Sequence, residues 1–230
     1  MAETGTRKQL EADMSDLKRM VLRLGMMSGD ALSRAVRALE KGDASPARAV
    51  IDGDDELDDL TERIGEGCMA FTARHQPLGQ DLRTVVSIIH IATDLERVGD
   101  YGVNISRTVL GLEDRPLLKP LIDIPRMAEL LLEMLNRALV AFDVGDAETA
   151  RKLFIMDEQI DALEKQVLRE LITMVLERTE RLEQAFMLLN VARTLERAGD
   201  HLTNIAERVV YMYTGKMARA SDYKTPRGRQ

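Results

Sequence analysis

Several features that mark secreted, membrane-spanning or disulfide-linked proteins are rare or absent in this chain. Its single cysteine, Cys68, excludes an internal disulfide and is typical of a reducing compartment. No apolar stretch is long enough to span a membrane, and the N-terminal sequence MAETGTRKQLEADMSD contains no apolar signal segment. We therefore expect a cytoplasmic protein without membrane insertion.

An excess of basic residues is also lacking. The chain has 32 Lys and Arg against 39 Asp and Glu, a net charge of −7, so we expect no direct binding of nucleic acid. The segment 216–230 is the exception, with the single acid Asp222 among five basic residues: Lys216, Arg219, Lys224, Arg227 and Arg229. We expect a basic, mobile tail there. A contact with an acidic partner or with anionic lipid is the alternative.

Aromatic and β-branched runs are sparse as well. Aromatic residues make up 3% of the chain and tryptophan is absent, whereas hydrophobic residues make up 45% and charged residues 31%. That balance is typical of a globular chain, and the abundant Leu, Ala, Met, Glu and Arg are strong helix formers. The composition predicts an all-α protein.

Apolar residues recur at helical spacing in three segments of the first half. These segments predict helices over about 10–41, 45–75 and 80–112. The sequence KGD ends the first helix, and Ser45-Pro46 supplies an N-cap and a first-position proline for the second. The sequence QPLG at 76–79 predicts a turn, and three prolines within 113–125 indicate a linker.

The same plan repeats about a hundred residues later. The sequence ALEKGD at 38–43 matches AFDVGD at 141–146, and LERVGD at 95–100 matches LERAGD at 195–200. We therefore predict a duplicated three-helix bundle with six helices in total. The predicted parts are a first bundle at 1–112, a linker at 113–125, a second bundle at 126–215 and the basic tail at 216–230.

Each predicted bundle carries two pairs of acidic residues at i, i+4, a spacing that places both members of a pair on one helix face. The pairs are Asp54 with Asp58 and Glu96 with Asp100 in the first bundle, and Asp157 with Asp161 and Glu196 with Asp200 in the second. In an antiparallel hairpin, the position of the turn decides which residues of the two helices lie at the same level. The two acidic pairs lie at one level in the first bundle if its turn centres on Pro77, and in the second bundle if its turn centres on Arg178-Thr179. The first of these is the predicted QPLG turn.

Four converging carboxylates raise each other's pKa unless a cation offsets their charge. A metal ion is one solution, because oxygen ligands suit Mg²⁺, Ca²⁺, Mn²⁺ or iron. Asn104 and Asn204 lie one turn further along and could add carbonyl oxygens. Arginine is the other solution, because Arg97 and Arg197 sit beside the pairs. The residues alone leave both solutions open.

Gly99 and Gly199 stand inside predicted helices, directly before Asp100 and Asp200. A glycine at such a position costs about 1 kcal/mol relative to alanine. Its missing side chain gives close access either to a neighbouring helix or to the shell of an ion. Both interpretations stay open.

Signs of catalytic chemistry are lacking. Histidine is not part of the repeat, since His201 is matched by Tyr101, and the Glu-x-x-His spacing of ferritin-type oxidases is absent. The sequence shows neither a nucleophile–base arrangement nor a glycine-rich phosphate loop. We therefore do not expect an enzyme.

The repeated DLERVGDYGVNI and TLERAGDHLTNI, together with the upstream DDELD and DEQID, resemble the PhoU family of phosphate-signalling regulators. The resemblance covers roughly residues 10–215 and implies two similar three-helix bundles. It also implies metal binding through (E/D)-x-x-x-D motifs, which coincide here with the eight acids named above. Asp94 is a possible further ligand, and Thr194 replaces it in the second copy, which would weaken that site.

The resemblance further implies a non-enzymatic cytosolic adaptor that represses the phosphate-starvation response when phosphate is plentiful. Its implied partners are the ATPase subunit of the phosphate ABC transporter and a sensor histidine kinase. Iron, manganese, magnesium and zinc are the candidate ions, and a homodimer stays open. A metal-free helical scaffold and, as a more distant alternative, a metal-dependent bundle enzyme are the competing hypotheses.

Overall fold

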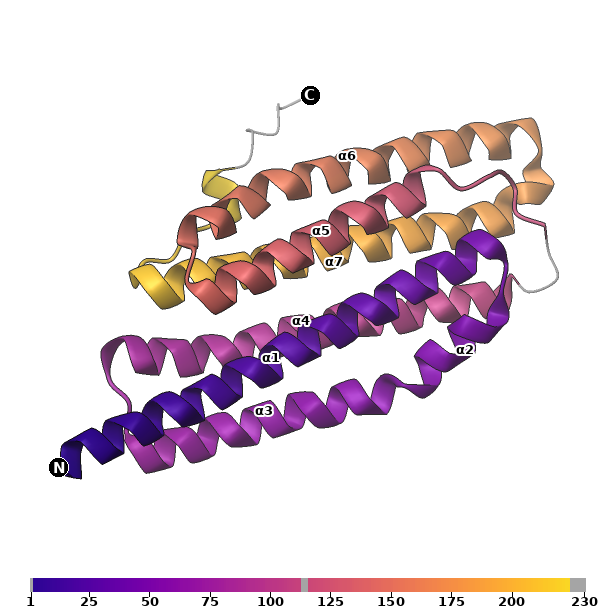
Figure 1. The fold of residues 1–230 in the computed structure, drawn as a ribbon. Coiled ribbons are helices and arrows are strands. Elements are labelled where there is room, and N and C mark those ends of the chain that lie inside the picture. The colour runs from indigo at the N-terminus through magenta and orange to yellow at the C-terminus, as the bar shows by residue number, and fades with distance from the viewer. Residues whose placement is uncertain (1, 113–115, 224–230) are drawn as a thin grey trace.

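The chain is helical throughout most of its length (Figure 1). The computed structural model describes residues 2–112 and 116–223. Its α-helices are α1 (Ala2–Lys41), α2 (Ala44–Asp52), α3 (Asp54–His75), α4 (Gly79–Gly111), α5 (Asp123–Val144), α6 (Ala147–Glu177) and α7 (Leu182–Thr214). Two short 3-10 turns are η1 (Thr179–Arg181) and η2 (Ala220–Asp222). These residues contain no strand, which confirms the all-α prediction, and none of their helices has the length and apolarity needed to cross a membrane.

The helices form two bundles that lie side by side (Figure 1). The first consists of α1 to α4 and the second of α5 to α7. α4 packs against α7 and α1 against α5, and one continuous cluster of buried apolar side chains runs through both bundles. With α2 and α3 counted as one broken helix, the structure confirms the duplicated three-helix plan and its six helices.

The second helix of the first bundle is interrupted at Gly53, where the sequence predicts one continuous helix over 45–75. The backbone of Gly53 departs from helical angles, with φ of −91° and ψ of 2°. The three residues that follow are all acidic, and the N-terminus of a helix stabilises negative charge. A new helix therefore starts at Asp54, and α2 and α3 run in different directions (Figure 1).

Both copies of the GD sequence join two helices in the same way. Gly42 and Gly145 adopt left-handed backbone angles, with φ of 64° and 80°, that glycine tolerates best. The aspartate that follows each glycine then caps the next helix. Asp43 accepts a hydrogen bond from the amide of Ser45, and Asp146 accepts hydrogen bonds from the next helix in the same manner.

The predicted cap of the second helix is therefore wrong by two residues. α2 begins at Ala44, so Asp43 and not Ser45 is its N-cap. Pro46 lies at the third position of the helix and not at the first. Proline is tolerated there because the amides of the first turn have no partner inside the helix.

The turns between the second and third helices lie where the acidic pairs require them. Residues 76–78 connect α3 to α4, and Arg178 with η1 connects α6 to α7. Both turn predictions are confirmed. α3 consequently packs against α4, and α6 against α7, which brings the acidic pairs of each bundle onto facing helices.

The predicted linker and tail are partly described. Residues 113–115 and 224–230 lie outside the described residues. α5 begins at Asp123, three residues before the predicted start. Residues 216–223, predicted as the beginning of a mobile tail, fold back on the second bundle: the amide of Ala220 donates to Glu207 at 2.8 Å, and the Tyr223 ring lies 5.3 Å from that of Phe154.

Candidate functional site

The first acidic cluster lies between α3 and α4 and consists of Asp54, Asp58, Glu96 and Asp100. Burial raises the pKa of Glu96, the charge of Asp100 raises it further, and Asp58 and Asp54 add smaller effects. The pKa of Asp54 is also raised, first by burial and then by Asp100 and Asp58. The carboxylates of α3 and α4 therefore lie near enough to raise one another's pKa.

The second acidic cluster lies between α6 and α7 and includes the four predicted acids Asp157, Asp161, Glu196 and Asp200. Burial raises the pKa of Glu196, followed by the charges of Asp200, Asp161, Glu164 and Asp157. Glu164 is a member that the sequence analysis missed. Its place one turn beyond Asp161 was visible in the sequence, but Thr61 holds the equivalent position in the first bundle, so the repeat did not reveal it.

Gly99 in α4 and Gly199 in α7 lie against different side chains of the facing helix. A Cβ at Gly99 would clash with the side chain of Leu57, so this glycine permits close packing of α3 on α4. A Cβ at Gly199 would lie 2.5 Å from Oδ1 of Asp157, a fully buried aspartate. In the first bundle the glycine thus accommodates a core leucine, and in the second it accommodates a carboxylate of the cluster.

Arginine neutralises part of the first cluster. Arg97 Nη1 lies 3.1 Å from Asp100 Oδ2, and Arg97 Nε lies 3.7 Å from Glu96 Oε2. The guanidinium is more than half exposed, so water weakens both pairs. In the second cluster, Arg193 Nε lies 3.9 Å from Glu164 Oε1. The pKa of Glu96 stays raised beside Arg97, first because of burial and then because of the charge of Asp100.

Asp94 faces the second bundle. Its Oδ1 lies 2.8 Å from Nδ1 of His201 and accepts a longer hydrogen bond, 3.5 Å, from Asn204. Asn104, the other predicted amide ligand, accepts a hydrogen bond from Arg107 at 3.2 Å. The structure therefore places these three additional candidates in contacts outside the eight carboxylates. His201 was missed because its role depends on the packing of α4 against α7, which helical periodicity does not reveal.

Both clusters offer carboxylate oxygens alone, the type of donor atom that hard cations prefer. In the part of the chain that the structure describes, no group of three or more His, Cys, Asp or Glu side chains forms a ready-made ligand set. A hard ion such as Mg²⁺ needs only one or two carboxylates, because it keeps several of its waters. Zn²⁺ is usually bound with histidine or cysteine and fits these all-oxygen clusters less well. Burial first, and neighbouring carboxylates second, raise the pKa of Asp54, Glu96 and Glu196, and a nearby positive charge would act in the opposite direction.

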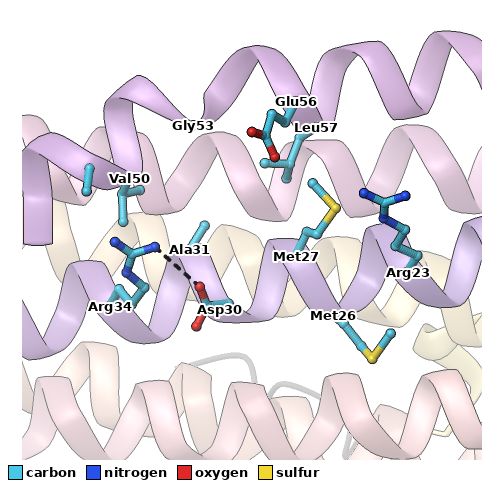
Figure 2. A pocket seen from close by; sticks show the side chains of 11 residues that line it. Arg23, Met26, Met27, Asp30, Ala31, Arg34, Val50, Gly53, Glu56 and Leu57 are labelled. Atoms are coloured by element: carbon cyan, nitrogen blue, oxygen red, sulfur yellow. Dashed lines mark hydrogen bonds and ion pairs between the residues drawn. The ribbon is translucent and has the colours of Figure 1, made fainter.

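A pocket of about 320 Å³ lies beside α1 at the break between α2 and α3 (Figure 2). Arg23, Asp30 and Arg34 line it from α1, and Glu56 lines it from α3 (Figure 2). Arg34 and Asp30 form an ion pair at 3.5 Å. Because two basic and two acidic side chains balance, the lining favours neither an anion nor a cation. The acidic clusters are therefore the better candidate site.

Comparisons with known proteins agree with this architecture. The family model described as the PhoU domain matches residues 21–109 and 124–209, one match in each bundle. The chain is 35% identical to the phosphate-specific transport system accessory protein PhoU homolog of Rhizobium meliloti over 89% of this chain and 87% of that protein. It is also 35% identical to the Aquifex aeolicus protein of the same description, over 94% of this chain and 98% of that protein.

Two crystal structures have the same fold. PhoU from Pseudomonas aeruginosa superimposes with a TM-score of 0.86 at 31% identity, covering 90% of this chain and 99% of that one. The phosphate transport system regulatory protein PhoU from Streptococcus pneumoniae gives a TM-score of 0.85 at 31% identity, with coverages of 91% and 99%. From the duplicated bundle, the repeated acidic motifs and these matches together, we conclude that the chain belongs to the PhoU family.

Proposed function

We propose that this chain is a non-enzymatic regulator of phosphate uptake and of phosphate-starvation signalling. Support comes from relatives described as accessory proteins of the phosphate-specific transport system, which match nearly the whole chain. In this proposal the chain works in the cytoplasm as an adaptor between the ATPase subunit of the phosphate ABC transporter and a sensor histidine kinase. It represses the starvation response when phosphate is plentiful.

The observation that carries the mechanism is the pair of acidic clusters, each shared between the second and third helices of a bundle. The residues that would hold the metal ions are Asp54, Asp58, Glu96, Asp100, Asp157, Asp161, Glu196 and Asp200. A bound ion supplies positive charge. Carboxylates of facing helices would share this charge, so α3 would be tied to α4 and α6 to α7. Partner proteins would then bind the surface formed by these paired helices.

A binding experiment tests the adaptor role. The purified chain, stripped of metal and then reloaded with Mn²⁺ or Mg²⁺, is titrated with the purified ATPase subunit and with the cytoplasmic part of the kinase. We expect both to bind the loaded chain more tightly than the stripped one. The Asp100→Ala/Asp200→Ala variant should not respond to metal. Equal affinity of loaded and stripped chain would remove the proposed role of metal, and binding of neither protein would contradict the adaptor role itself.

A metal-free scaffold is the alternative that one observation favours, because Arg97 already pairs with two acids of the first cluster. Replacing this arginine separates the two possibilities. Under the scaffold hypothesis, Arg97→Gln should destabilise the fold through the uncompensated carboxylates. Under the metal hypothesis, the loaded variant should be about as stable as the loaded wild type, since the ion supplies the missing charge. Thermal melts with and without Mn²⁺ measure the difference.

A further inference from the structure

A groove of about 440 Å³ opens where α1 ends and α2 begins, at one end of the first bundle (Figure 1). Its volume lies within the range of pockets that hold small organic ligands. The apolar part of its lining consists of alanine and proline side chains, and the charged part consists of Arg34, Arg37, Lys41 and Asp43. Three basic residues against one acid give this groove a positive charge, whereas the whole chain has a net charge of −7.

Most of this positive charge has no acidic partner. Arg37 and Lys41 are exposed, and neither forms an ion pair or hydrogen bond with the residues that the structure describes. Arg34 makes only a long ion pair, with 3.5 Å between its Nη1 and Oδ2 of Asp30. The one acid of the lining, Asp43, already accepts a hydrogen bond at 3.0 Å as the cap of α2. An anion that enters the groove would therefore be attracted to it.

The three basic residues follow one another along a single face of α1. Arg34, Arg37 and Lys41 stand at i, i+3 and i+7, and all three line the groove. Because an α-helix rises about 1.5 Å per residue, their backbone positions extend over roughly 10 Å. A chain of two or three phosphate groups matches this extent better than a single phosphate group does. Arginine binds phosphate oxygens in pairs through its planar guanidinium, and lysine binds them as a point charge.

The second bundle lacks this set of basic residues. The match of ALEKGD at 38–43 with AFDVGD at 141–146 places Val140 and Val144 at the positions of Arg37 and Lys41. Both valines are exposed, at 59% and 69%. Exposed positions place few demands on packing, so the helical repeat itself does not require arginine and lysine there. The basic groove is therefore a feature of the first copy alone.

We propose that this groove binds a small molecule that carries a linear chain of two or three phosphate groups, for example a nucleoside diphosphate or triphosphate. Arg34, Arg37 and Lys41 bind the phosphate oxygens, and the alanine and proline side chains of the lining contact the uncharged part of the ligand. The eight acids of the two clusters do not line the groove. Binding here is therefore independent of the metal ions proposed above.

Calorimetric titration of the full, metal-free chain tests this site with four soluble probes: inorganic phosphate, pyrophosphate, linear triphosphate and ATP. The titrations are made at about 0.1 M salt, which screens charges far from the groove. We expect the affinity to rise from phosphate to pyrophosphate to triphosphate, and ATP to bind at least as tightly as triphosphate. Arg37→Gln/Lys41→Gln should weaken the binding of triphosphate by about tenfold or more, because it removes two charge-assisted contacts. Arg34→Gln should weaken it as well.

Arg137→Gln/Lys152→Gln is the matched control, since it removes the same charge from the corresponding end of the second bundle. It should bind triphosphate within about twofold of wild type, because its charges are screened from the groove. The side chains replaced in the two double variants are exposed, and thermal melts check that the fold is intact.

A wild-type chain that binds neither triphosphate nor ATP at about 1 mM would overturn the proposal. So would a groove variant that binds triphosphate like wild type, or an equal loss in the groove variant and in the control. Vesicles that contain phosphatidylglycerol distinguish a lipid surface from a soluble ligand. Binding of these vesicles through Arg37 and Lys41, without binding of triphosphate or ATP, would assign the groove to a membrane and would also overturn the proposal.

Discussion

Asp94 of α4 and His201 of α7 meet across the boundary between the two bundles, with 2.8 Å between Oδ1 and Nδ1. Both side chains are mostly buried. The ring of His201 also lies 5.7 Å from that of Tyr101, its counterpart in the first copy. The equivalent residue of Asp94 in the second copy is Thr194, whose hydroxyl donates a hydrogen bond to the carbonyl oxygen of Asn190 in the same helix. The duplication is therefore asymmetric at the point where its two halves touch.

The contact between Asp94 and His201 should contribute to stability. We expect Asp94→Ala to lower the free energy of unfolding by about 1 kcal/mol, because it removes the acceptor of His201 and Asn204. Thr194→Ala is the matched control and should change the stability by less than half as much. Urea titration at neutral pH measures both variants. Equal effects of the two would show that the contact does not stabilise the boundary between the bundles.

The raised pKa values of Glu96 and Glu196 predict how stability depends on pH. Since each folded-state pKa lies above its unfolded value, the folded metal-free protein holds these protons more tightly than the unfolded chain. The contribution of these groups to stability therefore falls as pH rises from the unfolded pKa, about 4.5, through the raised folded pKa. Glu96→Gln/Glu196→Gln should remove this loss.

The test of this pH dependence is the difference in stability between the Gln variant and wild type, with metal removed. The variant should gain relative to wild type as pH rises from about 4.5 to about 7. Other acids act in the opposite sense, for example Asp146, whose pKa is lowered first by its hydrogen bond from the Thr149 hydroxyl. The difference between the two proteins cancels these contributions. A constant difference across this range would contradict the assignment.

Loss of a helix cap should be measurable at Asp146. Its Oδ1 accepts hydrogen bonds from the amides of Glu148 and Thr149, and its Oδ2 accepts one from the Thr149 hydroxyl. We expect Asp146→Ala to cost about 1 to 2 kcal/mol. Asp43→Ala should cost less, because Asp43 caps the short helix α2 through a single bond from Ser45. Thermal melts give the order of the two, and the reverse order would contradict this prediction.

Three glycines of the first bundle should respond to alanine in a defined order. A Cβ at Gly102 would lie 2.9 Å from the carbonyl carbon of Ala31, and backbone cannot move aside easily, so Gly102→Ala should cost about 1 to 3 kcal/mol. In Gly99→Ala the new Cβ would contact the flexible end of the Leu57 side chain, so this variant should lose less stability than Gly102→Ala. In Gly65→Ala the new Cβ would have open space around it, and Gly65 lies inside α3, so this variant should stabilise the fold by about 0.5 to 1 kcal/mol.

The order of these melting temperatures is the test, with Gly65→Ala highest and Gly102→Ala lowest. A neutral Gly102→Ala would show that α1 and α4 can separate at this point without cost. Such a result would contradict the close packing of the two helices.

Local patterns in the sequence were sufficient for the helices, the repeat and the turn at Pro77. The spacing of the acids also located the turn at Arg178, where the sequence contains no strong helix breaker. Gly53 was not predicted to interrupt a helix, because glycine inside a helical pattern is often tolerated and the cost depends on what packs nearby. The break follows from three acids in a row starting a new helix there.

Contacts between the two bundles could not be predicted from periodicity. Asp94 and His201 are far apart in the chain, and nothing in either helix specifies which face of α4 meets α7. For the same reason Asp94 could be considered a ligand of the first cluster until its partner was known. The roles of Gly99 and Gly199 also differ only because Leu57 and Asp157 occupy the facing helices.

The most direct test of the central claim is the melting temperature of the metal-stripped chain after addition of Mn²⁺, Mg²⁺, Fe²⁺ or Zn²⁺, compared with Asp100→Ala/Asp200→Ala. At an ion concentration one hundred times the dissociation constant, binding adds about 2.7 kcal/mol. For a chain of this size that corresponds to a rise of roughly 5 to 10 °C. We predict such a rise with at least one hard ion in wild type and little or none in the variant. No shift with any ion, or equal shifts in both proteins, would contradict a metal role for the two acidic clusters.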